Sequence, residues 1–151
     1  MDLLCACASK PTIWKVASNG GHVVQIAGRD SSYPLESGDG KYVYFARNNR
    51  LWQVRTDGTN EELVAGMPAI GILGDKWFPV ESGIYFLSPE GDGRNLEFFD
   101  IKSKQVHRIF TLEKPAPDWM GEMPVSRDGK WLLYPQLDST SSDIMMIENW
   151  R

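Results

Sequence analysis

The chain has 151 residues, of which 42% are hydrophobic and 24% are charged, and its formal net charge is −4. A chain of this length can bury one hydrophobic core, so a single domain over 1–151 is expected. Nucleic acids and anionic membranes are bound through concentrated basic surfaces, which a mildly acidic chain does not favour. Every apolar run is far shorter than the roughly 20 residues of a transmembrane helix, so no membrane span is predicted.

The first residues include Leu4-Cys5-Ala6-Cys7, which superficially resembles a lipoprotein cleavage box. Few residues precede it and one is acidic, whereas a signal peptide needs a basic segment and an apolar segment. No export signal is therefore predicted. The two cysteines cannot supply the four ligands of a structural zinc site, and at alternate strand positions they are expected to be small buried side chains.

The chain is predicted to be all-β, with little or no helix. Its apolar runs are short, rich in aromatic and β-branched residues, and bounded by Gly, Asn, Asp, Ser or Pro, as strands are. In chain order the strands are expected at 3–8, 12–17, 22–28, 33–36, 41–47, 51–55, 61–66, 77–80, 83–88, 95–101, 105–112, 122–126, 130–137 and 143–149.

A turn followed by an apolar strand recurs at Asp39-Gly40-Lys41, Glu81-Ser82-Gly83 and Asp128-Gly129-Lys130. In the two Asp-Gly turns the glycine is expected to take a positive φ while the aspartate caps the backbone. Asp39, Gly40, Asp128 and Gly129 are therefore predicted to be structural, and the two turns are expected to share one conformation.

A period of about 40–45 residues with four strands is typical of a β-propeller blade. The strands form units at approximately 1–28, 32–66, 74–112 and 118–151. The first unit contains strands B to D, the middle two contain A to D, and the last contains A to C. About three and a half blades result, whereas closed propellers have roughly four to eight. The predicted fold is a partial propeller that forms an open arc.

Several segments together resemble TolB-like (WD-repeat-like) propeller repeats: "IWKVASNGGHVVQIA", "ESGDGKYVYFAR", "LWQVRTDGTNEELV", "GIYFL" with "LEFFDI", and "VSRDGKWLLYPQLDSTSSDIMMIENWR". The resemblance covers nearly the whole chain. It is strongest to the C-terminal propeller of large bacterial, notably acidobacterial, proteins that begin with a winged-helix transcriptional-regulator domain or a serine/threonine kinase domain. The final "DIMMIENWR" is similar to the usual end of such proteins.

The resemblance implies a non-enzymatic interaction or sensor module, the C-terminal part of a larger regulatory protein, with a protein partner. The chain lacks a kinase catalytic loop and a basic recognition helix, so direct nucleic-acid binding is not expected. The alternative is the propeller part of a prolyl-oligopeptidase-like hydrolase or of a ligand-binding enzyme. Taken alone the chain would stay in the cytoplasm, whereas a TolB-like or membrane-anchored parent would place it in the periplasm.

No catalytic, metal or cofactor site is predicted. Ser82 lacks a nucleophile elbow, because Val80 and Ile84 occupy the positions where that motif has glycine. His22 and His107 lie in outer-strand segments without a partner at a suitable spacing, so neither a metal site nor a catalytic triad is expected.

The six tryptophans offer candidates for packing and for binding. Trp14 and Trp52 occupy equivalent strand C positions and are expected to pack between blades. Trp77, Trp119 and Trp131 lie in or near the A–B region, close to the rims of the propeller. Because aromatic residues are favoured where proteins bind partners, these three form the possible partner-binding rim.

The open ends carry a further expectation. In the strand at 41–47, Tyr42 and Tyr44 are expected on one face and Val43 and Phe45 on the other, both covered by neighbouring blades. The first and last blades should each leave one apolar face uncovered. The strand at 143–149 would be an unpaired edge. The protein is therefore expected to pair with another copy or to need further blades.

Overall fold

The computed structural model describes residues 10–71, 76–91, 93–117, 123–126 and 129–139. Over these residues it contains ten strands in three antiparallel sheets and no helix. The predicted all-β fold is therefore confirmed. The predicted strands at 3–8 and 143–149 lie outside the described residues.

The first sheet pairs β1 (Ile13–Lys15) with β2 (Val24–Ala27). The second sheet has the strand order β3 (Ser32–Glu36), β4 (Tyr42–Arg47), β5 (Arg50–Arg55) and β6 (Glu62–Leu63). Each strand pairs with the next along the chain, so the sheet is a four-stranded meander. This arrangement is that of a propeller blade with strands A to D.

The third sheet repeats this meander with β7 (Trp77–Val80), β8 (Gly83–Leu87), β9 (Asn95–Asp100) and β10 (Val106–Thr111). After it, the strands predicted at 122–126 and 130–137 do not form over their described residues, where Val125 and Leu132 make only an isolated antiparallel bridge. The N–H of Leu133 donates to the carbonyl of Pro124 at 3.0 Å, which continues this pairing by one step. The described residues thus include the start of a further blade.

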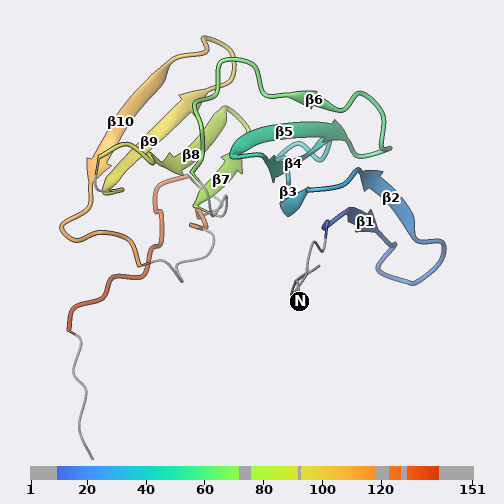
Figure 1. The fold of residues 1–151 in the computed structure, drawn as a ribbon, viewed down its shortest axis with the longest axis horizontal. Helices are drawn as coiled ribbons and strands as arrows, with labels where there is room; N and C mark the ends of the chain where they lie inside the picture. Colours follow the sequence, from blue (N-terminus) through green and yellow to red (C-terminus); the bar gives the residue numbers. More distant parts are fainter. Residues whose placement is uncertain (1–9, 72–75, 92, 118–122, 127–128, 140–151) are drawn as a thin grey trace, which may run out of the picture.

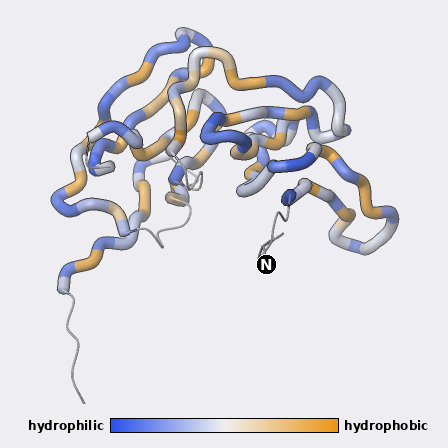
Figure 2. The backbone as a smooth tube through the Cα atoms, viewed as in Figure 1, coloured by the Kyte–Doolittle hydropathy of each residue, from blue (hydrophilic) through white to orange (hydrophobic). Residues whose placement is uncertain are grey.

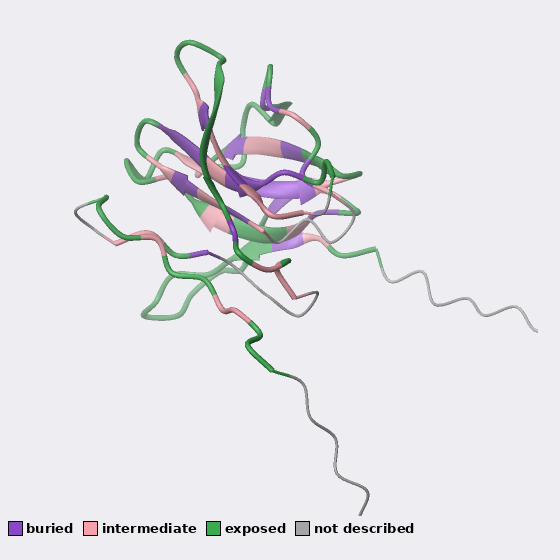
Figure 3. Cartoon of the chain, turned by 90° about the vertical axis from the view of Figure 1, so that its left-hand side faces the viewer, coloured by how far each residue is buried: buried purple, intermediate pink, exposed green. Residues whose placement is uncertain are grey.

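The three sheets follow one another around an open arc (Figure 1). β3 and β7 are the inner strands of the second and third sheets, and β6 and β10 lie on the outside. Short hydrophobic stretches occur in all three sheets (Figure 2). β10 is exposed along its whole length, as expected of an outer edge strand (Figure 3).

Three hydrophobic cores lie between successive units. The first core joins the first and second sheets and consists of Ile13, Ile26, Ala27, Phe45 and Val54, with Val43 and Trp52 against it. The second core joins the second and third sheets and includes Tyr44, Ala46, Leu51, Trp77, Ile84, Phe86 and Phe99. The third core joins the third sheet to the segment that follows and consists of Leu87, Leu96, Leu112 and Met123, with Tyr85, Ala116 and Leu132 against it.

β4 shows how one strand serves two cores. Val43 and Phe45 contact the first core, whereas Tyr42 and Tyr44 contact the second. Successive side chains of a strand point to opposite faces, so every blade has one face toward the preceding unit and one toward the following unit. The predicted division of these four residues between two covered faces is confirmed.

The turn before β8 corrects the repeat alignment. Ser82 accepts a hydrogen bond from the N–H of Ile101, just as Lys41 accepts one from the N–H of Thr56. Ser82 rather than Gly83 is therefore the counterpart of Lys41, and the predicted alignment of Gly83 with Lys41 is off by one residue. Only two residues connect β7 to β8, so this turn is shorter than the Asp-Gly turn. An alignment that is off by one residue assigns every side chain of the strand to the wrong face of the sheet.

Candidate interaction surfaces

The Asp39 turn is held by its own side chains. Asp39 Oδ1 accepts hydrogen bonds from the Ser37 hydroxyl at 2.8 Å and from the Lys41 N–H at 3.1 Å, while Lys41 Nζ lies 3.0 Å from Oδ2. The Ser37 hydrogen bond, followed by the interactions with Lys41, lowers the pKa of Asp39 to about 2. A carboxylate held ionised in this way suits a turn and not a general acid.

The second Asp-Gly turn has the same hydrogen bonds at its described residues. Gly129 donates to the Ser126 carbonyl as Gly40 does to that of Ser37, both at 2.9 Å. The Ser126 hydroxyl accepts the N–H of Trp131 at 3.0 Å, and that of Ser37 accepts the N–H of Tyr42 at 3.0 Å. Both glycines have φ of 69°. Asp128 lies outside the described residues.

This equivalence aligns the residues that follow the second Asp-Gly turn with those of β4. Trp131 corresponds to Tyr42, Leu132 to Val43, and Leu133 to Tyr44. Leu132 packs against the third core, as Val43 packs against the first core. Trp131 and Leu133 must then point toward the following unit, and they are 70% and 66% exposed. We call Trp131 and Leu133 the C-terminal surface.

A comparison of strand C in the first two blades, which is β1 in the first and β5 in the second, identifies the corresponding surface at the N-terminal end of the arc. Leu51 of β5 contacts the second core, and its neighbours Trp52 and Val54 contact the first core. In the first blade the counterparts are Ile13, which contacts the first core, and Trp14 and Val16, which therefore point toward a preceding unit.

Trp14 and Val16 are 55% and 57% exposed, and we call them the N-terminal surface. The prediction that Trp14 packs between blades is wrong for this structure. Trp14 and Trp52 do occupy equivalent positions, but among the described residues only Trp52 has a neighbouring sheet on its side.

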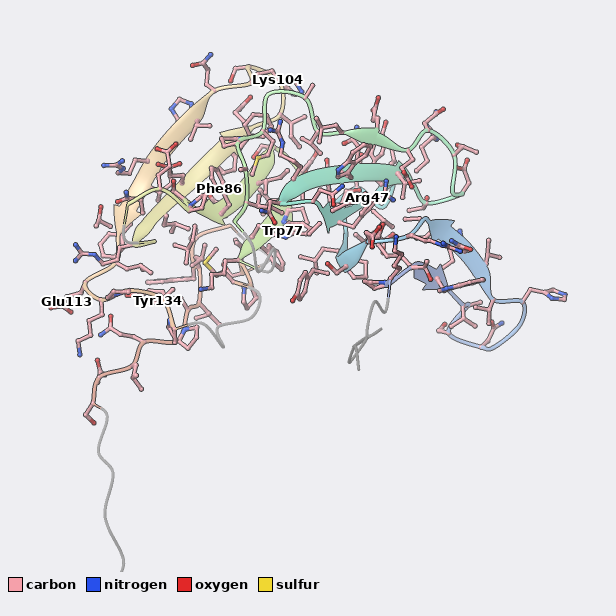
Figure 4. The ribbon with its side chains drawn as sticks, in the orientation of Figure 1. Arg47, Trp77, Phe86, Lys104, Glu113 and Tyr134 are labelled. Atoms are coloured by element: carbon pink, nitrogen blue, oxygen red, sulfur yellow. The ribbon has the colours of Figure 1, made fainter. Side chains whose placement is uncertain are left out.

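Trp77 of β7 is fully buried in the second core, together with residues of the second and third sheets (Figure 4). It pairs in register with Phe86, which is also fully buried. This burial argues against the partner-binding rim position predicted for Trp77, because β7 is covered by the second sheet. Trp119 lies outside the described residues. Of the three rim candidates, Trp131 alone has a described, exposed side chain.

Arg47 of β4 lies beside the connection between the first two sheets and was not singled out by the sequence. Its Nε and Nη2 donate to the hydroxyl of the buried Ser31 at 3.1 and 2.8 Å, and its Nη1 lies 2.5 Å from Glu61. The guanidinium lies 5.0 Å from the ring centroids of both Phe45 and Trp52. Arg47 lowers the pKa of Glu61 through its hydrogen bond and its charge. This cluster covers the edge of the first core and is structural.

The described residues provide no constellation for metal binding, since no three His, Cys, Asp or Glu side chains cluster there. His107 lies in β10 opposite Phe98, and His22 lies in the β1–β2 connection. Burial raises the pKa of Tyr44 to about 12, which fits its place in the second core. No helix in the described part of the chain could cross a membrane.

No protein-family model matches the chain, and no curated protein matches it. Three chains of solved structures do match. Among them is the crystal structure of TolB from Acinetobacter baumannii, with a TM-score of 0.63 and 16% sequence identity over 80% of this chain. The chain has a TolB-like β-propeller fold. At this identity the likeness extends to the fold alone, and the match spans only 31% of the TolB chain.

Proposed function

We propose that this chain is a non-enzymatic interaction module, whose two terminal blade faces bind protein. The observation that carries this proposal is the exposure of Trp131 and Leu133, whose counterparts in β4 contact the second core. Trp14 and Val16 repeat the situation at the other end of the arc. Aromatic residues are favoured where proteins bind partners.

The TolB-like fold supplies the stacked sheets that this reading needs, and the likeness to TolB goes no further than the fold. We further propose that the chain acts as the sensor part of a larger regulatory protein, with a winged-helix or kinase domain elsewhere in that protein. This finer proposal rests on the sequence resemblance of the repeats. A substrate screen that detected hydrolysis depending on one residue of this chain would contradict the non-enzymatic assignment.

Site-specific photo-crosslinking tests the binding surfaces. Benzoylphenylalanine at position 14 or 131 should give protein adducts in cells of the source organism. The matched control is position 109, because Ile109 in β10 is 53% exposed but belongs to neither surface. The position-131 adduct should disappear when Leu133→Glu is added beside it. Equal labelling at all three positions, or none at 14 and 131, would contradict the proposed function.

A further inference from the structure

We propose that the occupant of these surfaces is a second copy of this chain, docked head to tail. In this arrangement the N-terminal surface of one copy packs against the C-terminal surface of the other. The inference rests on the proposed function and names its partner.

The packing inside the molecule supplies the first argument. We call the face of a sheet that is turned toward the previous unit its preceding face, and the opposite face its following face. In the second core, Ile84 and Phe86 lie on the preceding face of the third sheet. They pack with Tyr44 and Leu51, which lie on the following face of the second sheet. The first core has the same construction, with Phe45 and Val54 from a preceding face against Ile13 from a following face. Each sheet-to-sheet core thus joins one preceding face to one following face.

The two exposed surfaces are of these two opposite kinds. Trp14 and Val16 belong to a preceding face, whereas Trp131 and Leu133 belong to a following face. A head-to-tail contact would therefore continue the stacking already present in the chain. A contact between two identical surfaces has no counterpart among the three cores, and it would reverse the order in which the twisted sheets follow one another.

The open shape of the described part of the chain leaves room for such a contact. Its three sheets follow one another without closing into a ring (Figure 1). Head-to-tail contacts form closed rings when the rotation between copies permits it.

Four proteins test the contact by sedimentation velocity from low micromolar to several hundred micromolar: the wild type, Trp14→Glu, Trp131→Glu and Ile109→Glu. The wild type is expected to sediment at twice the chain mass of 17.1 kDa or more. Trp14→Glu and Trp131→Glu should each weaken association at least about tenfold. In a head-to-tail assembly made of one variant alone, every contact between copies contains the introduced charge, which is costly to bury. Ile109→Glu should associate like the wild type.

Mixing the two tryptophan variants separates head-to-tail from symmetric contact. An equimolar mixture of Trp14→Glu and Trp131→Glu has one intact contact, formed by the remaining Trp131 of one chain and the remaining Trp14 of the other. The mixture should therefore recover a species of two chains that neither variant forms alone. If both tryptophan variants stay associated, if only one of them dissociates, or if the mixture stays monomeric, the head-to-tail contact is wrong.

Circular dichroism of each variant checks that it is folded. Val16→Glu replaces Trp14→Glu if that variant is not folded, and Leu133→Glu likewise replaces Trp131→Glu. A wild type that stays monomeric throughout overturns the second copy as partner. The crosslinking experiment then decides the proposed function separately. Adducts to a different protein at positions 14 and 131 would leave the proposed function standing, whereas adducts between copies of this chain support both.

Discussion

Trp131 and Tyr42 each donate their backbone N–H to the hydroxyl of the serine that begins an Asp-Gly turn, at the same distance of 3.0 Å. Their surroundings differ, because Tyr42 packs against the second core and Trp131 is 70% exposed. The same local structure therefore accompanies opposite burial, depending on whether the described residues include a neighbouring sheet on that side.

Trp77→Ala should destabilise the fold strongly. The side chain is fully buried in the second core, and truncation of a buried Trp costs about 3–5 kcal/mol. Phe110→Ala in the exposed strand β10 is the control, with an expected loss within about 1 kcal/mol. Urea unfolding followed by tryptophan fluorescence and circular dichroism measures both. A Trp77→Ala variant as stable as Phe110→Ala would contradict the buried position.

Gly83→Ala should also destabilise. A Cβ at Gly83 would lie 2.8 Å from Cε2 of Phe98 and closer still to the backbone carbonyl oxygen of Phe99, which cannot move away without breaking the β8–β9 pairing. Overpacking of this kind costs roughly 1–3 kcal/mol or more. Gly28→Ala is the control, because its Cβ would find only the flexible end of Arg47, at 3.7 Å. Thermal unfolding of the two variants should separate them clearly.

The ion pair between Arg47 and Glu61 should be energetically coupled. A double-mutant cycle with Arg47→Met and Glu61→Gln is expected to give about 0.5–3 kcal/mol of coupling, because the Arg47 side chain is largely buried and also bonds Ser31. The same cycle at Arg55 and Asp57, an exposed pair 3.9 Å apart, should give close to zero. Equal coupling in both cycles would mean that burial of Arg47 does not strengthen its interaction with Glu61.

The Asp39 turn should contribute a pH-dependent part of the stability. Because the folded pKa is about 2 and the ordinary value is 3.8, this contribution is present above about pH 4 and is lost as the pH falls toward 2. NMR titration of the Asp39 carboxyl should show a midpoint near 2. Ser37→Ala should raise that midpoint, since the Ser37 hydroxyl is the largest cause of the shift. Thr59→Ala, in the neighbouring Asp57 turn, should leave it unchanged.

The positions of the ten strands and the A-to-D order within the second and third sheets were predictable because they depend on local patterns. The strands predicted at 122–126 and 130–137 form only an isolated bridge over their described residues. The alternation of Tyr42, Val43, Tyr44 and Phe45 reports the two faces of a strand directly. The turn before β8 was misaligned because a shorter turn shifts the register without changing the apolar composition of the strand. Such a shift becomes visible only through the hydrogen bond between Ser82 and Ile101.

The candidate surfaces were only partly predictable. Trp131 was expected at a rim because of its place in the repeat, yet Trp77 met the same criterion and is buried. The difference arises from the packing of whole sheets. Trp77 of β7 packs against the second sheet, whereas Trp131 lies in the segment at which the described arc ends. Arg47 was missed because its partners Ser31 and Glu61 lie 14 or more residues away and carry no motif.

The division of the interior into three separate cores also shapes how the chain resists unfolding. Each core involves only adjacent units, so cooperativity passes from neighbour to neighbour as in a one-dimensional array. β4 and β5 contribute to the first and second cores, and β8 and β9 contribute to the second and third, whereas β1 and β2 contribute to one. The amides of the second and third sheets should therefore exchange with solvent more slowly than those of the first sheet, where opening should begin.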